Sequence, residues 1–158
     1  IMALVTLNNR SLVNADVGTV LQVVTATDST ERSTTSTSFV TGSNTLSVDI
    51  TPSSSSNKIY ITSTFEAGTS DTGNTSTLYT LYRGSTNLSA NIQGFSRIYF
   101  SGLGTHASQI NQSIQILDSP NTTSATTYQI YMKGIGGNTF YFNKSGVTGS
   151  IVAMEIAG

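Results

Sequence analysis

Acidic side chains are the residues of this sequence best suited to catalysis or metal binding. The eight carboxylates are Asp16, Asp28, Glu31, Asp49, Glu66, Asp71, Asp118 and Glu155. A calcium site needs about six to eight oxygens, often from one acidic loop, and a glycosidase needs two carboxylates that flank the sugar. Neither spacing occurs, and the nearest approach, Asp71–Asn74, is typical of a hairpin turn. Glu66 and Glu155 could meet from distant strands, but a strand-edge or salt-bridge role is favoured over catalysis.

Nucleophiles and phosphate-binding loops lack the context that their chemistry requires. The single histidine, His106, lies in a small-residue segment that indicates a loop, with no visible partner to orient it as a base. The nucleophile motif GxSxG is absent, and the glycines near Gly102 and Gly134 precede no helix that would direct amides at a phosphate. Cysteine is absent, which excludes thiolate metal sites. We therefore assign no catalytic, cofactor-binding or metal-binding residue and expect no enzyme.

Aromatic side chains are the strongest signal for a binding surface. Tyr79, Tyr82, Tyr99, Phe140 and Tyr141 come in closely spaced groups that place rings on both faces of their strands. One face of each group cannot lie in a simple core between two sheets. A subunit interface, where Tyr and Phe are enriched, is the favoured interpretation. A glycan-contacting platform is the alternative for the same five residues.

The elements that must position these rings are β-strands. In Lys58–Glu66 the side chains Ile59, Ile61 and Phe65 share one face and polar residues share the other, which is the period of a strand. The same alternation occurs in Leu46–Ile50, Ile110–Ile116, Tyr128–Met132 and Ile151–Ile156, and Val20–Thr27 is the first confident strand. Clusters of Gly, Asn, Asp and Ser separate the runs, and both prolines, Pro52 and Pro120, lie in such clusters. The pattern predicts an all-β fold, an antiparallel β-sandwich of jelly-roll type, with about eight to ten strands.

Composition excludes several classes of partner. Only 9% of the 158 residues are charged and the formal net charge is -1, so no basic surface for nucleic acid or anionic lipid is expected. The apolar runs are too short for a membrane-spanning helix. A weakly charged surface opposes self-association little, which favours a homo-oligomer.

The first 18 residues differ from the rest. Leu4, Val5, Leu7, Leu12 and Val13 flank a polar centre, and confident strand periodicity begins only after Gly18. A small helix and an extended arm that packs on another chain are both compatible with this pattern. We expect residues 1–18 to form an arm or attachment segment and residues 19–158 to form the sandwich domain.

Several ordered fragments resemble a known family. These are Gly18–Val24, Leu46–Ile59, Leu117–Tyr128 and the closing Met154–Ile156, and together they cover most of the chain after residue 18. They resemble small β-rich structural proteins of tailed phages, tail-fibre or virion-appendage proteins of marine or cyanobacterial type. The resemblance implies a virion appendage domain, commonly trimeric, with no catalytic motif. The matching Pro52 and Ser53–Ser56 are expected to shape a turn.

We expect a non-enzymatic virion structural protein: a tail fibre or knob, or a capsid-surface appendage. It would assemble with itself, as a homotrimer, would attach to other virion proteins through the N-terminal arm, and could contact the host surface. A carbohydrate-binding module that recognises a host glycan is the alternative. A hydrolase of surface polysaccharide is the third hypothesis, and it requires two carboxyls about 5 to 10 Å apart in a groove.

Overall fold

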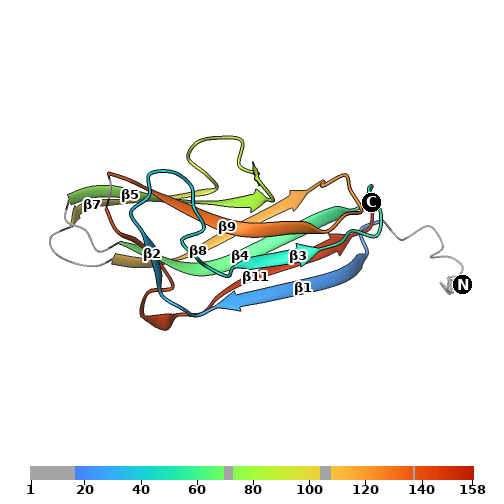
Figure 1. Ribbon diagram of the computed structural model, residues 1–158, viewed down its shortest axis with the longest axis horizontal. Coiled ribbons are helices and arrows are strands. Elements are labelled where there is room, and N and C mark those ends of the chain that lie inside the picture. Colours follow the sequence, from blue (N-terminus) through green and yellow to red (C-terminus); the bar gives the residue numbers. More distant parts are fainter. Residues whose placement is uncertain (1–16, 70–72, 104–107, 137) are drawn as a thin grey trace, which may run out of the picture.

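The computed structural model describes residues 17–69, 73–103, 108–136 and 138–158. Within these ranges the chain forms two antiparallel sheets that pack face to face as an elongated sandwich (Figure 1). The strands are β1 (Val20–Asp28), β2 (Arg32–Thr34), β3 (Ser47–Ile50), β4 (Lys58–Thr69), β5 (Gly73–Arg83), β6 (Thr86–Asn87), β7 (Ser96–Leu103), β8 (Ser108–Asp118), β9 (Thr126–Ile135), β10 (Phe140–Phe142) and β11 (Gly149–Ile156). A 3-10 turn, η1 (Lys144–Gly146), separates β10 from β11.

The strand order identifies the architecture. The first sheet runs β1-β11-β4-β8. The short strand β10 pairs with the same edge of β4 as β11 does, but farther along β4, and β2 pairs with β10. The second sheet runs β3-β9-β5-β7, with β6 hairpinned onto β5. Among these eight principal strands the chain changes sheet at every connection except that from β5 to β7. This order is the jelly roll, and it confirms the predicted all-β antiparallel sandwich.

Alternation along the strands builds the core. β11 is the clearest case, because its residues are buried and partly exposed in strict turn. Side chains of both sheets interdigitate between them, and the fully buried ones include Leu46, Ile59, Ile61, Leu81, Tyr128, Ile130, Met132 and Ile151. Phe65, Tyr79 and Phe142 form a ring cluster, with centroids 4.8 to 5.1 Å apart. The strands predicted from period two are therefore confirmed, and Pro52 and Pro120 lie in connections, as expected.

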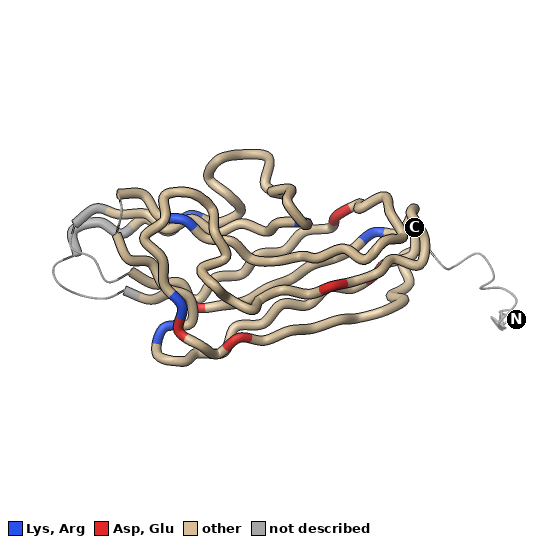
Figure 2. The backbone as a smooth tube through the Cα atoms, viewed as in Figure 1, with Lys and Arg blue, Asp and Glu red and all other residues tan. Residues whose placement is uncertain are grey.

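The beginning of the described chain lies beside its end. Gly18 donates its amide to the carbonyl of Ala157 at 2.8 Å, and Ala157 donates to the carbonyl of Thr19 at 2.9 Å. Residues 1–16 lie outside the described residues, so the arm and the boundary at residue 18 remain predictions. The described residues include no helix with the length and apolar character needed to cross a bilayer. Charged residues are sparse and scattered along the sandwich (Figure 2).

Candidate interaction surfaces

Two of the five predicted surface aromatics lie in the interior of the chain. Tyr79 and Phe140 are both 0% exposed. The Tyr79 ring packs on Phe65 and Phe142, and its hydroxyl donates to the Tyr141 carbonyl at 3.0 Å. Phe140 reaches across to the second sheet, where Gly134 leaves space for its ring. The expectation of a surface role for these two is corrected: each occupies the inward position of its strand.

The other three predicted aromatics face outward but lie on different sheets. Tyr99 of β7 is 56% exposed, and the Arg97 guanidinium lies 5.9 Å from its ring centroid. Tyr141 of β10 belongs to the other sheet and has the Lys144 ammonium 4.4 Å from its ring centroid. Tyr82 lies on β5, in the same sheet as Tyr99. The prediction that one ring of each closely spaced group faces outward is therefore confirmed for Tyr82, Tyr99 and Tyr141, but these rings do not form one surface.

An aromatic cluster does form around Tyr82, on the outer face of the second sheet. Its ring stacks on Tyr131 of β9, with centroids 4.0 Å apart and planes 25° from parallel. Phe39, from the segment before β3, meets Tyr82 edge-on at 6.4 Å. The Lys133 ammonium lies 4.5 Å from the centroid of the Phe39 ring. Sequence reasoning missed three of these residues, although the outward parity of Tyr131 and Lys133 in β9 was a usable signal.

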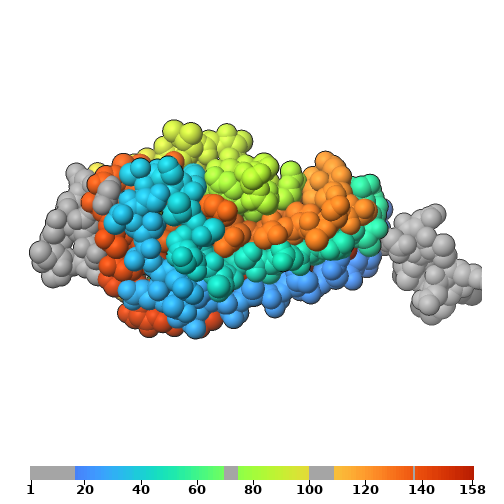
Figure 3. Space-filling model, viewed as in Figure 1, coloured from blue at the N-terminus to red at the C-terminus, as the bar shows by residue number. Residues whose placement is uncertain are grey.

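A hollow of about 450 Å³ lies beside this cluster, and we call it the β9 hollow. Its lining comes from three segments that meet on the face seen in Figure 3: the stretch before β3, the end of β6 with the loop that follows it, and β9. The lining residues are Phe39, Asn87, Ser89, Ala90, Asn91, Ile92 and Lys133. The β9 hollow thus combines an aromatic wall, amides, a hydroxyl and one ammonium group.

Local hydrogen bonds fix how the two asparagines of the β9 hollow are oriented. The Asn87 Oδ1 accepts from the Thr80 hydroxyl at 2.6 Å and from the Ser89 amide and hydroxyl, both at 3.0 Å. The Asn91 Oδ1 accepts from the Gln93 amide at 2.7 Å. Each oxygen is occupied, which orients the amide, and neither Nδ2 donates a hydrogen bond to a described residue, so these donors are left for a ligand.

The outer face of the first sheet carries a row of apolar side chains. Val23, Met154, Tyr60 and Leu117 lie directly opposite one another on β1, β11, β4 and β8. Val23 is 51% exposed and Leu117 is 52% exposed, at the two edges of the sheet. We call these four residues the apolar row. Val20 and Leu21 extend the exposed apolar surface toward the end where Gly18 meets Ala157.

The same face is polar farther along the strands. Thr27, Ser150, Thr64 and Ser113 form a parallel row of hydroxyls four residues away, and the Thr64 and Ser150 hydroxyls are 3.1 Å apart. The distance between the two rows is roughly 13 Å from the rise of a strand. Apolar and hydroxyl-bearing residues are thus segregated along the sheet.

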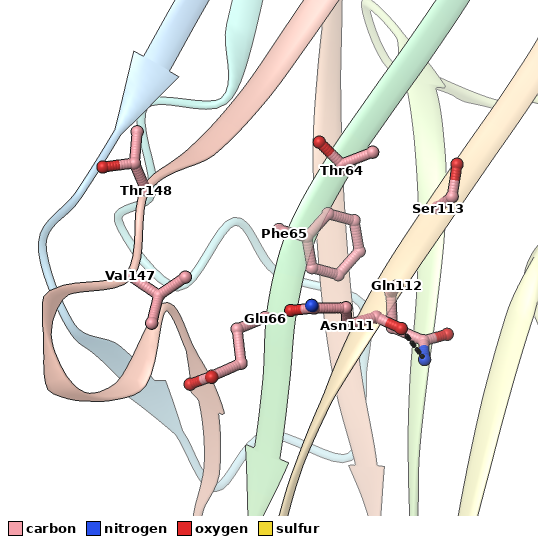
Figure 4. A pocket seen from close by; sticks show the side chains of 8 residues that line it. All are labelled: Thr64, Phe65, Glu66, Asn111, Gln112, Ser113, Val147 and Thr148. Carbon is pink, nitrogen blue, oxygen red and sulfur yellow. Dashed lines mark hydrogen bonds between the residues drawn. The ribbon is translucent and has the colours of Figure 1, made fainter.

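A second hollow, of about 350 Å³, lies just beyond the hydroxyl row, where β10 and β11 leave a break along β4 (Figure 4). Glu66, Asn111, Val147 and Thr148 are among its lining residues. The Glu66 Oε1 is buried and accepts no hydrogen bond from the described residues. Glu66 does not meet Glu155, which pairs with Ile59, seven positions away on β4. Within the described ranges no three His, Cys, Asp or Glu side chains gather as a metal site would require.

Two further carboxylates with low exposure, Glu155 and Asp118, serve the fold. Glu155 and Asp118 flank Ile59 on neighbouring strands, about 10 Å apart by strand spacing. Asp118 receives the Arg83 guanidinium at 2.9 and 3.0 Å and the Tyr128 hydroxyl at 2.7 Å. Burial and the Asp118 contact raise the pKa of Tyr128.

Glu155 receives four hydrogen bonds of 2.6 to 2.8 Å from Gln22, Ser53 and Asn57. Burial opposes ionisation, but the donors outweigh it and lower the pKa of Glu155 to about 2. Both carboxylates are saturated and line neither hollow, so the pair offers no support for a hydrolase. Glu155 therefore has a structural role, as the sequence favoured, but hydrogen bonds and not a salt bridge hold its carboxylate. His106 lies outside the described residues.

Comparisons with known proteins give a structural likeness only. No family model matches the chain, and no curated protein matches its sequence. Among solved structures, a mutant VP2 protein of infectious bursal disease virus, from derived T=1 particles, aligns over 86% of this chain at 16% identity with a TM-score of 0.40. The alignment covers 36% of the VP2 chain, so this protein spans little more than a third of its length. The fold assignment rests on the strand order described above.

Proposed function

We propose that this protein is a non-enzymatic virion structural protein, a tail fibre or knob or a capsid-surface appendage, that assembles with copies of itself. The apolar row is the observation that carries the proposal. Contiguous exposed apolar surface on a folded domain marks an interaction site, because leaving it in water is unfavourable. The resemblance of Gly18–Val24, Leu46–Ile59 and Leu117–Tyr128 to phage structural proteins supplies the virion setting.

A homotrimer accommodates this surface naturally. The apolar row ends in Val23 at one edge of the sheet and in Leu117 at the other. In a three-fold assembly with the first sheets turned to the axis, the β1 edge of one copy meets the β8 edge of the next. Such a contact joins two different patches and closes after three copies. Each half-exposed Val or Leu would contribute on the order of 1 kcal/mol on burial.

The N-terminal arm completes the proposal. The described chain starts next to Ala157, at the end of the first sheet that carries Val20 and Leu21. Residues 1–16 contain Leu4, Val5, Leu7, Leu12 and Val13, which are suited to apolar docking. The arm would attach the domain to other virion proteins at this end. The opposite end and the second sheet would be left to contact the host surface.

Light scattering coupled to size-exclusion chromatography tests the assembly. The native chain should elute at three times the mass of one copy. Val23→Lys should raise the dissociation constant at least about tenfold, because it places an ammonium group in an apolar contact. Thr27→Lys is the matched control, since Thr27 lies on the same strand and the same outer face but in the hydroxyl row. A native chain that stays monomeric at high concentration, or equal effects of the two variants, would refute the proposal.

Saccharide binding is the second candidate function. The specific observation in its favour is the ring cluster of Phe39, Tyr82 and Tyr131 beside the amides of the β9 hollow. Sugars bind by stacking their C–H faces on such rings while amides and hydroxyls bond their hydroxyl groups. This function is compatible with the first, because the β9 hollow lies on the sheet opposite to the apolar row.

A further inference from the structure

We propose that the β9 hollow binds an acidic sugar, a pyranose unit that carries a carboxylate, with Lys133 facing the carboxylate. The inference rests on the second candidate function and names its ligand class and its residues. Pockets that bind small ligands commonly measure about 300 to 1,000 Å³, combining apolar walls with a few polar groups. The hollow, at about 450 Å³, lies in this range.

The charge of the β9 hollow is positive and uncompensated. Lys133 is its single ionisable lining residue and makes no salt bridge with a described residue. In the sheet Lys133 lies opposite Leu78, and Leu78 lies opposite Arg97, so the next charge in this direction is also positive. The carboxylate of Asp49 is on the strand beside β9 but pairs with Thr127, six positions away. An anion at this site therefore meets a cation without a competing carboxylate.

The wall of the hollow favours a sugar over a bare anion. Lys133 is held over the Phe39 ring, and Phe39 leads to the stacked Tyr82 and Tyr131. Ile92, 77% exposed, adds an apolar rim on the loop after β6. Phe39 and Ile92 are the large apolar groups that line the hollow itself. An inorganic anion gains nothing from them, whereas the C–H face of a pyranose would pack on them.

The amides supply the remaining contacts. The bonds that Thr80, Ser89 and Gln93 donate fix the side-chain oxygens of Asn87 and Asn91, and the Nδ2 groups donate to no described residue, which leaves them for the ligand. Gly94 keeps the loop close to the sheet: a Cβ there would lie 2.4 Å from the Tyr79 carbonyl oxygen. The β9 hollow is therefore lined by a ring, an ammonium and amide donors held by the fold, which is the set that an acidic sugar requires.

A glycan array with matched pairs tests the inference on the full-length chain. Each acidic glycan, ending in a uronic or sialic acid, is printed beside its neutral counterpart. Acidic probes should bind at least tenfold more tightly, and the preference should weaken as salt is added. Lys133→Gln should remove the preference. Lys144→Gln is the matched control, since the Lys144 ammonium also lies over an aromatic ring, that of Tyr141, but outside the hollow.

Phe39→Leu provides a second variant, because it keeps the ammonium but removes the aromatic ring that lines the hollow, and it should lower affinity for every bound sugar. The inference is overturned if no acidic glycan binds better than its neutral partner, if Lys133→Gln and Lys144→Gln behave alike, or if inorganic sulfate competes as well as the sugar does. Light scattering on the same samples reports assembly separately. A failure of sugar recognition is thereby distinguished from a failure of the structural proposal.

Discussion

At the scale of single residues, Glu155 shows how a weakly charged chain uses an acid inside its fold. The carboxylate is 1% exposed, yet it accepts bonds from the Ser53 amide and hydroxyl and from the side chains of Gln22 and Asn57. Gln22 belongs to β1, and Ser53 and Asn57 both belong to the connection between β3 and β4. Glu155 on β11 therefore joins three segments that are distant in sequence. The serine turn suggested by the phage resemblance is tied down by this contact.

We predict that replacing Glu155 lowers the stability of the fold in a pH-dependent way. The pKa of Glu155 falls from its ordinary value of 4.5 to about 2 in the folded chain. The ionised form therefore stabilises the fold above pH 4.5, by about 3 kcal/mol, and this stabilisation is lost as the pH falls from 4.5 to 2. Glu155→Gln should lower the free energy of unfolding by roughly this amount at pH 7 and flatten its acid dependence.

Urea denaturation between pH 2 and pH 7 measures this effect. Glu31→Gln serves as the matched control, because Glu31 is exposed and accepts one bond, from the Ser145 amide at 3.0 Å. The control should retain the acid dependence of the native chain. Equal stability of Glu155→Gln and the native chain at pH 7 would show that the four donors are satisfied equally well by a neutral amide.

At the scale of elements, the strands were largely predictable and the partners of their side chains were not. Period two predicted β1, β3, β4, β8, β9 and β11 because those segments alternate between core and solvent. The same parity separates Tyr79 from Tyr82, three positions apart, but it does not say which of the two points inward. That choice depends on the neighbours across the sandwich, such as Phe65 and Phe142 around Tyr79.

The β9 hollow could not be predicted from the alternation of residues along single strands. Its lining comes from residue 39, residues 87–92 and residue 133, which only the folded chain brings together. The apolar row likewise depends on the register of four strands, and register is set by tertiary packing and turn geometry. Val23 and Leu117 each appear unremarkable in their own segments.

The contact between β9 and β10 gives a sharp test of packing between the sheets. Gly134 is buried, and a Cβ added there would lie 1.5 Å from the Phe140 ring. Gly134→Ala should therefore destabilise the fold by about 2 kcal/mol or more, as overpacking does. Adding Phe140→Leu to Gly134→Ala should recover part of the loss, whereas Phe140→Leu alone should destabilise the native chain. Thermal unfolding of the three variants measures the coupling, and simple additivity would contradict the contact.

At the scale of the whole molecule, the two proposals assign different roles to the two outer faces. One sheet presents the apolar row near the chain ends, and the other presents the β9 hollow. Charged residues are sparse along the backbone in Figure 2, and a net charge of -1 offers little repulsion between copies. A jelly roll with one face for its sister copies and one for its ligand fits an appendage on a particle.

Oxidative footprinting of the assembled chain tests this division most directly. Met154 and Tyr60 lie in the apolar row, Met132 is buried within each copy, and Tyr99 is exposed on the opposite sheet. On concentration from dilute monomer to assembly, hydroxyl-radical labelling should fall several-fold at Met154 and Tyr60. Labelling of Tyr99 should persist, and Met132 should stay unlabelled throughout. Undiminished labelling of Met154 in the assembled species would contradict the account.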